Sequence, residues 1–244
     1  MEVTRCWVAW SSGKDSALAL HEALADPGLE VVGLLTTLSE PSDAVTMHAV
    51  PRALVEAQAA ALGLPLHLVA VPDPCSDDEY ERRMGAAVAA AVADGVTAVV
   101  FGDLHLADVR AYRETSLAGS GLEPLFPLWE RPVGELAARM AGSLEAIVTC
   151  VDTAQLDASF AGRRYDDDLL ADLPPGVDPC GENGELHTFV RNAPAFAHPI
   201  QVTVGATLMD GPFARVPLTP TTDDEHPPRL EGGLQPRSTS PVGP

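Results

Sequence analysis

The fold of this chain is decided by one stretch, Trp10-Ser11-Ser12-Gly13-Lys14-Asp15-Ser16, which directly follows an apolar run typical of a strand. Lys14 is the single lysine of the sequence, against fourteen arginines. The planar guanidinium of arginine does not replace a compact ammonium packed against phosphate. A turn between a strand and a helix is also where backbone N–H groups and the positive end of the helix dipole hold an anion. The stretch therefore predicts a phosphate-binding loop.

Two common phosphate motifs do not fit this loop. A Walker A loop requires Ser or Thr after Gly13-Lys14, where this chain has Asp15, and its first glycine would fall at Val8. A dinucleotide fingerprint fails because the sequence has no G-x-G-x-x-G. The purely structural alternative is that Ser11 and Ser12 cap the first helix while Asp15 stabilises its first turn.

Composition restricts the fold class and the partners. The chain has 244 residues, of which 46% are hydrophobic and only 5% aromatic, so we expect one α/β unit with a core of Ala, Val and Leu, plus a tail. Its net charge of -20 argues against a nucleic-acid surface, which needs clustered Lys and Arg. Many of the acidic residues fall between 152 and 185, where a solvated acidic face is the simplest interpretation.

The cysteines and the N-terminus exclude other classes. Cys6, Cys75, Cys150 and Cys180 form no C-x-x-C pair, so neither a zinc knuckle nor a dithiol redox centre is predicted. The N-terminus lacks the apolar region of a signal peptide, and no run of about eighteen apolar residues occurs. We therefore expect a cytoplasmic protein that does not contact a membrane.

Apolar runs alternate with helical stretches, which predicts an open, mostly parallel sheet with helices on both faces, Rossmann-like in architecture. The predicted strands lie near Cys6–Trp10, Glu30–Thr36, Leu66–Val71, Ala98–Phe101 and Ala146–Val151. The predicted helices are Asp15–Ala25, Pro51–Leu62, Asp77–Ala93 and Pro132–Ala141.

The regular alternation stops near residue 151, which predicts three regions. Residues 1–151 would form the nucleotide-binding domain, and 152–218 a small α+β substrate subregion. Within it, Pro199–Leu208 and Phe213–Leu218 read as an antiparallel hairpin around the Asp210-Gly211 turn. Residues 219–244 are rich in Pro, Thr and Gly and are predicted to be a disordered tail.

The loop resembles the S-G-G-x-D-S pyrophosphatase loop (PP-loop) of the adenine nucleotide α-hydrolase superfamily, with Ser12 where the family usually has a glycine. Over residues 1 to 216 the chain is similar to the diphthine-ammonia ligase family and its bacterial ATP pyrophosphatase relatives. The segments that carry this resemblance are Leu34 to Thr37, Met47-His48, Phe101 to Asp103, Asp108 to Glu114, Pro127 to Trp129, and Gly181 to Thr188.

The resemblance implies an adenine nucleotide α-hydrolase-like fold that binds ATP and Mg²⁺ and cleaves ATP to AMP and pyrophosphate. Lys14 and Asp15 would be catalytic, with Asp15 also orienting the magnesium ion. The ATP-binding residues would be Ser11, Ser12, Gly13, Lys14, Asp15, Ser16, Thr36, Thr37, Gly102 and Asp103. The last four follow strand ends, where open α/β sheets bind ligands; ordinary strand-end hydrogen bonding for the threonines and helix capping for Asp103 remain alternatives.

The substrate-binding residues implied are His48, Arg113, Glu114, Glu182, Asn183, Glu185, His187 and Thr188. Arg110 and Arg113 fall three residues apart on one helical face, and either a phosphate clamp or a surface ion pair with Glu114 fits that spacing. His187 stands where the family usually has an acidic residue, which implies a different acceptor.

The reaction implied is that of an amide ligase: ATP adenylates a substrate carboxylate, and ammonia or an amine then displaces AMP. The acceptor would be a small molecule or a protein side chain, with no nucleic-acid partner and with a homodimer as one option. A nucleotide-binding sensor without turnover is one alternative, and a tRNA-modifying PP-loop enzyme, which would bind RNA in a salt-sensitive way, is another.

Overall fold

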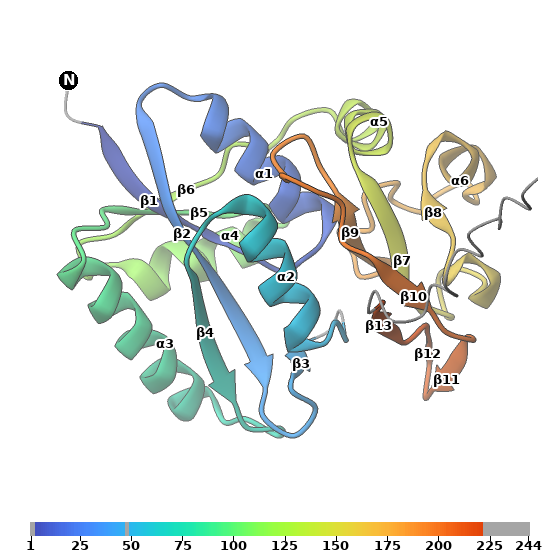
Figure 1. Ribbon diagram of the computed structural model, residues 1–244, viewed down its shortest axis with the longest axis horizontal. Coiled ribbons are helices and arrows are strands. Elements are labelled where there is room, and N and C mark those ends of the chain that lie inside the picture. The colour runs from blue at the N-terminus through green and yellow to red at the C-terminus, as the bar shows by residue number, and fades with distance from the viewer. Residues whose placement is uncertain (1–2, 47–48, 222–244) are drawn as a thin grey trace, which may run out of the picture.

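The computed structural model describes residues 3–46 and 49–221, and the first unit is built on a mostly parallel sheet (Figure 1). Its strands are β1 (Thr4–Ala9), β2 (Leu29–Ser39), β3 (Ala44–Val45), β4 (Leu66–Val71), β5 (Ala98–Val100) and β6 (Glu123–Leu125). Hydrogen-bonded neighbours run β4, β2, β1, β5, β6, all parallel, and the short β3 pairs antiparallel with β2. From β1 the chain adds strands first on one side, β2 and β4, and then on the other, β5 and β6. Open α/β sheets bind ligands at the carboxyl end of the strands, at the position where the strand order reverses in this way.

Helices cover both faces of this sheet, as predicted. On one face lie α1 (Lys14–Ala25), α2 (Arg52–Leu62) and α5 (Val133–Ser143), whose apolar side chains share the larger core. On the other lie α3 (Asp77–Ala93) and α4 (Ala107–Leu117), which pack on a smaller core with Trp7 and Val99 of the sheet. The helix α4 was missing from the predicted helices, although the spacing of Arg110 and Arg113 was taken to be helical.

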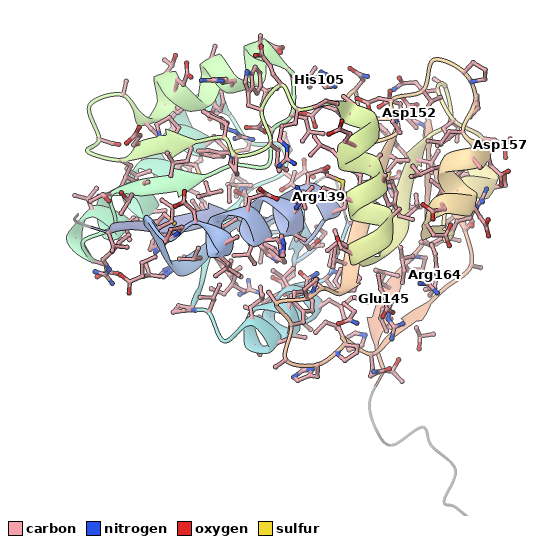
Figure 2. All side chains as sticks on the ribbon, turned by 90° about the horizontal axis from the view of Figure 1, so that it is seen from above. His105, Arg139, Glu145, Asp152, Asp157 and Arg164 are labelled. Carbon is pink, nitrogen blue, oxygen red and sulfur yellow. The ribbon has the colours of Figure 1, made fainter. Side chains whose placement is uncertain are left out.

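The second unit is a five-stranded antiparallel sheet that lies beside α1 and α2 (Figure 1). It contains β7 (Glu145–Asp152), β8 (Arg164–Tyr165), β9 (Leu186–Asn192), β11 (Leu208–Asp210) and β12 (Phe213–Arg215). Arg139 on α5 pairs with Glu22 on α1 at 2.5 Å, where the two helices meet (Figure 2).

The strand predicted at Ala146–Val151 forms as β7, but its assignment to the parallel sheet is wrong. It pairs antiparallel with β8, β9 and β12 in the second sheet. All of its residues from Ala146 to Val151 are buried, so it has the continuous apolar pattern that usually marks a parallel strand. The pattern reports burial on both sides of the strand and not the direction of its partners.

The predicted hairpin forms around its turn, but both of its predicted strands are wrong in extent. Asp210 pairs with Phe213 across the turn, as expected. The run Phe213–Leu218 divides into β12 and the first residue of β13 (Leu218–Pro220), which pairs with β10 (Val202–Val204) in a separate sheet. The run Pro199–Leu208 contains β10 and only the first residue of β11. Gly205 lies between them, where an added Cβ would be 2.7 Å from Pro217. The close approach of the chain to Pro217 therefore interrupts the strand.

A 3-10 turn (Ala158–Phe160) and α6 (Asp167–Asp172) lie in the second unit, and β13 includes the first two residues of the predicted tail. Residues 222–244 lie outside the described part of the chain.

All four cysteines are free thiols. Within residues 3–46 and 49–221, none of the helices has the length and apolar character needed to cross a membrane.

Candidate functional site

The predicted phosphate loop joins the carboxyl end of β1 to the first residue of α1. Gly13 is the N-cap of α1. Its backbone is extended, and no side chain makes a capping hydrogen bond at this end of the helix. The Ser16 hydroxyl donates to the Gly13 carbonyl at 3.0 Å and lies 3.2 Å from the Ser11 hydroxyl. The two serines thus stabilise the loop, while the positive end of the α1 dipole faces the carboxyl end of the sheet.

Ser12 has an unusual backbone and an unusual side chain. Its φ of 70° lies in the left-handed region, where a non-glycine residue is strained. The side chain is completely buried, and among the described residues its hydroxyl has no hydrogen-bond partner. A buried orphan hydroxyl in a loop at a helix N-terminus fits a site for an anionic ligand, because it retains an unused donor.

Lys14 lies behind the loop. Its side chain is 2% exposed, and its Nζ donates to both carboxylate oxygens of Asp15, at 3.1 and 2.9 Å. The ammonium also lies 5.5 Å from the centre of the Tyr165 ring. Burial is the largest single influence and lowers the pKa of Lys14, but the charge and hydrogen bonds of Asp15, together with Cys180 and Glu182, outweigh it and raise the pKa above its usual value. The lysine therefore stays charged and holds the Asp15 carboxylate in place.

A cavity of about 1140 Å³ opens beside the loop at the carboxyl end of β1. Ser11, Asp15 and Ser16 line its polar end together with residues from β5 and from the segment before β9. The cavity continues as a groove between α3 and α4, over an apolar floor that includes Leu35 and Val99. Its size exceeds the roughly 300–1,000 Å³ of a typical small-molecule site. The cavity therefore has room for a nucleotide and for a second ligand.

Three carboxylates, those of Asp15, Asp103 and Glu182, line the polar end. Burial raises the pKa of Glu182 to about 7, against a hydrogen bond from the Leu104 backbone N–H that lowers it. Burial also raises the pKa of Asp103, and the nearby Arg113 opposes the shift. Such a group of carboxylates beside a phosphate site requires cations, which Lys14 and Arg113 supply only in part.

Arg113 and Arg110, which the spacing placed on one helical face, differ in the structure. Arg113 lines the cavity, with its Nε 3.4 Å from Asp103 Oδ2. Arg110 donates to Glu114 at 2.8 Å in a surface pair, which confirms the ion-pair interpretation for that arginine. Of the two, Arg113 is the one positioned to contact a ligand.

The segment 178–185 closes over the end of β5. The Glu182 carboxylate accepts from the Leu104 N–H at 2.9 Å, and Asp178 Oδ2 lies 2.8 Å from Nε2 of His105. His105 is on the loop between β5 and α4, where that loop faces the second unit (Figure 2). Neither His105 nor Asp178 was among the predicted site residues, and a lone histidine after a strand gave no signal of this pairing.

Glu185 organises the same segment from inside. Its side chain is buried and accepts hydrogen bonds from the backbone N–H groups of Asp178 and Asn183 and from the Asn183 side chain. Glu185 and Asn183 do not line the cavity, so both shape the segment that presents Glu182. The expectation of a solvated acidic face does not hold for Glu185.

The predicted site residues divide into two groups. Those that line the cavity are Ser11, Asp15, Ser16, Thr37, Gly102, Asp103, Arg113, Glu182, His187 and Thr188. Those described residues that do not line it are Ser12, Gly13, Lys14, Thr36, Glu114, Asn183 and Glu185. The Thr36 hydroxyl donates to the Trp10 carbonyl at 2.7 Å, so this threonine makes the ordinary strand-end hydrogen bond that was the alternative to ligand binding. His48 lies outside the described residues.

Gly102 is required by the packing of the protein itself. A Cβ at this position would lie 2.9 Å from the Asp15 carbonyl carbon and 3.0 Å from the Ser16 nitrogen. The close approach that the glycine allows is therefore that of the first turn of α1. This contact fixes the phosphate loop against the end of β5.

Within residues 3–46 and 49–221, no group of three or more His, Cys, Asp and Glu side chains forms a metal site. Magnesium in nucleotide sites needs only one or two carboxylates, because substrate phosphates and water complete its shell. Asp15 at the cavity wall fits such a role, so the donors present are compatible with Mg²⁺ bound together with a nucleotide.

The chain matches two family models and is similar to proteins with names from the same family. The model of the diphthamide synthase N-terminal domain matches residues 4–124, and that of the diphthamide synthase C-terminal domain matches residues 133–211. Relatives named diphthine-ammonia ligase, from Mus musculus and Rattus norvegicus, are each 25% identical to the chain and cover 85% of it and 86% of their own length. A solved structure described as a predicted subunit of tRNA methyltransferase from Methanocaldococcus jannaschii matches with a TM-score of 0.43 and 15% identity. It covers 78% of this chain and 98% of that one, a likeness too distant to bear on function.

Proposed function

Because the chain belongs to the diphthamide synthase family, we propose that it is an ATP-dependent, AMP-forming carbon-nitrogen ligase. The observation that carries the proposal is the loop from Ser11 to Ser16, which opens at the strand-order reversal onto a cavity lined by carboxylates. Nucleotides bind at this position in open α/β sheets, with phosphate at the helix N-terminus. The 25% identity of the ligase relatives supports the same chemistry.

ATP would lie across the strand ends with its β and γ phosphates against the loop. Ser11 and Ser16 line the cavity, and their hydroxyls would turn from each other and from the Gly13 carbonyl to donate to phosphate oxygens. Asp15 would hold Mg²⁺, which when bound neutralises phosphate charge. Lys14 supports this arrangement from behind, because its two hydrogen bonds fix the Asp15 carboxylate.

The reaction has two steps that balance without a covalent enzyme intermediate. A carboxylate oxygen of the acceptor forms a bond to the α phosphorus, and the bond from that phosphorus to the bridging oxygen breaks and releases pyrophosphate. The nitrogen of ammonia or an amine then attacks the acyl carbon, AMP leaves, and the nitrogen loses its extra proton. The protein contributes mainly by positioning the reactants and by placing charge, which accelerate such transfers strongly.

Arg113 is the residue best placed to hold the acceptor carboxylate, because it is a cation at the cavity wall next to Asp103. Glu182, His187 and Thr188 line the same end and would contact the acceptor or the nitrogen donor. The groove between α3 and α4 leaves space for either a small molecule or a side chain of a protein.

The test is product identity from ATP labelled at the α phosphate. Purified protein is incubated with labelled MgATP, with and without a small-metabolite extract and ammonium, and AMP is separated from ADP. We expect AMP and pyrophosphate in equal amounts, stimulated by the extract and lost in Lys14→Ala. Arg110→Gln, whose side chain pairs on the surface, serves as the matched control and should retain activity. ADP as the product, or tight ATP binding with no turnover, would contradict the ligase and leave a nucleotide-binding module.

A further inference from the structure

A buried glutamine outside the cavity is attached to the phosphate loop. Gln58 lies on α2, is 0% exposed, and is surrounded on its own helix by the buried apolar residues Leu54, Val55 and Ala59. A polar side chain in such a position is stable only when its hydrogen-bonding groups are satisfied. The apolar face of α2 itself gives no reason for a glutamine at this position.

The amide of Gln58 makes three hydrogen bonds, and each reaches a different element. Its oxygen accepts from the Trp10 indole N–H at 2.9 Å, at the end of β1. Its nitrogen donates to the Ser12 carbonyl at 3.1 Å and to the Val190 carbonyl of β9 at 2.6 Å. Both N–H groups and the carbonyl are therefore used, and the side chain joins the phosphate loop to both units of the fold.

The contact to Ser12 fixes the orientation of one peptide group. The Ser12 carbonyl accepts from Gln58 and also from the Val190 N–H at 2.9 Å. In a planar trans peptide the carbonyl and the following N–H point in opposite directions. Holding the Ser12 carbonyl toward α2 and β9 thus turns the Gly13 N–H away from them and toward Ser11, to whose hydroxyl oxygen it donates at 3.4 Å. Ser11 lines the cavity.

The backbone of Ser12 shows that this orientation needs support. A residue with a Cβ is disfavoured at a φ of 70°, and only glycine adopts that region freely. The two donors on the Ser12 carbonyl offset this strain. Without them the peptide between Ser12 and Gly13 is free to rotate, and the Gly13 N–H then loses its hydrogen bond to the Ser11 hydroxyl at the cavity wall.

We propose that Gln58 is a positioning residue that holds the peptide between Ser12 and Gly13 with its N–H on the Ser11 hydroxyl, which keeps Ser11 at the cavity wall where the phosphate groups of the ligand would bind. The inference rests on the proposed function, since the ligand is the nucleotide bound at the loop. Gln58 itself touches neither the cavity nor the ligand, and it acts through the Ser12 carbonyl.

The first test is ligand binding by Gln58→Met, which keeps the length and apolar stem of the side chain but removes its donors. Calorimetry with MgATP and with pyrophosphate should show an affinity about tenfold lower, the effect of losing roughly 1.4 kcal/mol of hydrogen bonding. Leu54→Ala on the same helix is the matched control, because it loses buried contacts without touching the loop. It should lower the unfolding temperature yet leave both affinities within about twofold of the wild type.

The second test separates loop orientation from general damage. In a Ser12→Gly background the left-handed backbone is no longer strained, so Gln58→Met should lower affinity by less than about threefold, and the two substitutions should be clearly non-additive. In protein labelled with ¹⁵N-glycine, the Gly13 amide signal should shift on adding pyrophosphate to the wild type and shift less in Gln58→Met.

Each remaining outcome contradicts the proposal in a distinguishable way. Unchanged affinity in Gln58→Met, an equal loss in Leu54→Ala, or additive effects with Ser12→Gly would overturn the positioning role alone. Wild-type protein that binds neither MgATP nor pyrophosphate would overturn the proposed function together with it.

Discussion

The Glu182 carboxylate accepts a hydrogen bond of 2.9 Å from the backbone N–H of Leu104, across 78 residues of sequence. The contact attaches the segment before β9 to the end of β5 and places a partly buried carboxylate beside Asp15 and Asp103. Burial dominates its titration, because the pKa of Glu182 is raised to about 7 in spite of this hydrogen bond. The same residue therefore closes the site and introduces a titratable group near neutral pH.

The raised pKa of Glu182 predicts a pH-dependent stability. Between about pH 4.5, where glutamate ionises in an unfolded chain, and pH 7, the folded protein binds the proton more tightly than the unfolded chain does. This contribution to the free energy of unfolding is therefore fully present below about pH 4.5 and is lost as the pH rises to 7. Glu182→Gln keeps the acceptor for Leu104 and cannot ionise.

Urea unfolding of wild type and Glu182→Gln at pH 4.5 and pH 8 measures this effect. Relative to the wild type, the variant should gain roughly 1–3 kcal/mol between the two pH values, after allowance for the partial exposure of the carboxylate. The comparison at pH 4.5 is the internal control, because the side chain at position 182 is uncharged in both folded proteins there. An identical difference at both pH values would show that Glu182 titrates normally.

Arg113 and Arg110 form a matched pair for testing the electrostatics of the cavity. Arg113→Gln removes the cation beside Asp103 and leaves the cavity carboxylates less neutralised, so the dissociation constant for MgATP should rise about tenfold. Arg110→Gln removes a surface partner of Glu114 and should change it by less than about twofold. Calorimetry at low and high salt measures both, and the Arg113 effect should shrink with salt. Equal effects of the two substitutions would mean that Arg113 does not neutralise the carboxylates around the bound nucleotide.

Gly102 provides a test of how the loop is fixed. In Gly102→Ala the new Cβ would lie 2.9 and 3.0 Å from backbone atoms of Asp15 and Ser16, which cannot move without shifting α1. We expect a loss of about 1–3 kcal/mol in the free energy of unfolding and weaker binding of MgATP. In Gly142→Ala on α5 the new Cβ would have no neighbouring atom within 4 Å. This variant should leave the free energy of unfolding unchanged or raise it by about 0.5–1 kcal/mol. Equal stability of the two variants would mean that α1 has room to adjust.

The sequence predicted the strand-loop-helix unit well because its signals are local. The run before Trp10, the small polar turn and the helix after Gly13 each follow from neighbouring residues, and α3 was predicted at its observed limits, Asp77–Ala93. The partner of β7 depends instead on residues far along the chain, and its buried pattern fits either kind of sheet. Strand content was therefore predictable where strand pairing was not.

Site residues show the same division. Ser11, Asp15 and Ser16 share one loop, and the structure places all three at the cavity wall. Gln58 was missed because its partners, Ser12 and Val190, lie 46 and 132 residues away. One signal was available, since a glutamine interrupts the apolar face of α2. Such an interruption indicates a buried hydrogen-bond partner without saying which one.

Thr188 offers the last test, because it attaches the second unit to the loop through Lys14. Its hydroxyl, 1% exposed on β9, accepts a hydrogen bond of 3.1 Å from the Lys14 backbone N–H. Thr188→Val leaves that buried N–H without this acceptor, which should lower the free energy of unfolding by about 1–3 kcal/mol. The loss falls at the turn where the phosphate groups would bind. Thr149→Val on β7 loses a longer bond of 3.3 Å to the His187 carbonyl and leaves the Lys14 N–H with its acceptor.

Both valine variants should unfold at lower urea concentration, but only Thr188→Val should also weaken MgATP binding, by about fivefold to tenfold. The distinction follows from geometry, because the amide of Lys14 belongs to the first turn of α1 and any shift of it moves the adjacent Asp15. If the two variants weaken MgATP binding equally, then the second unit contributes only stability, and the loop keeps its shape without Thr188.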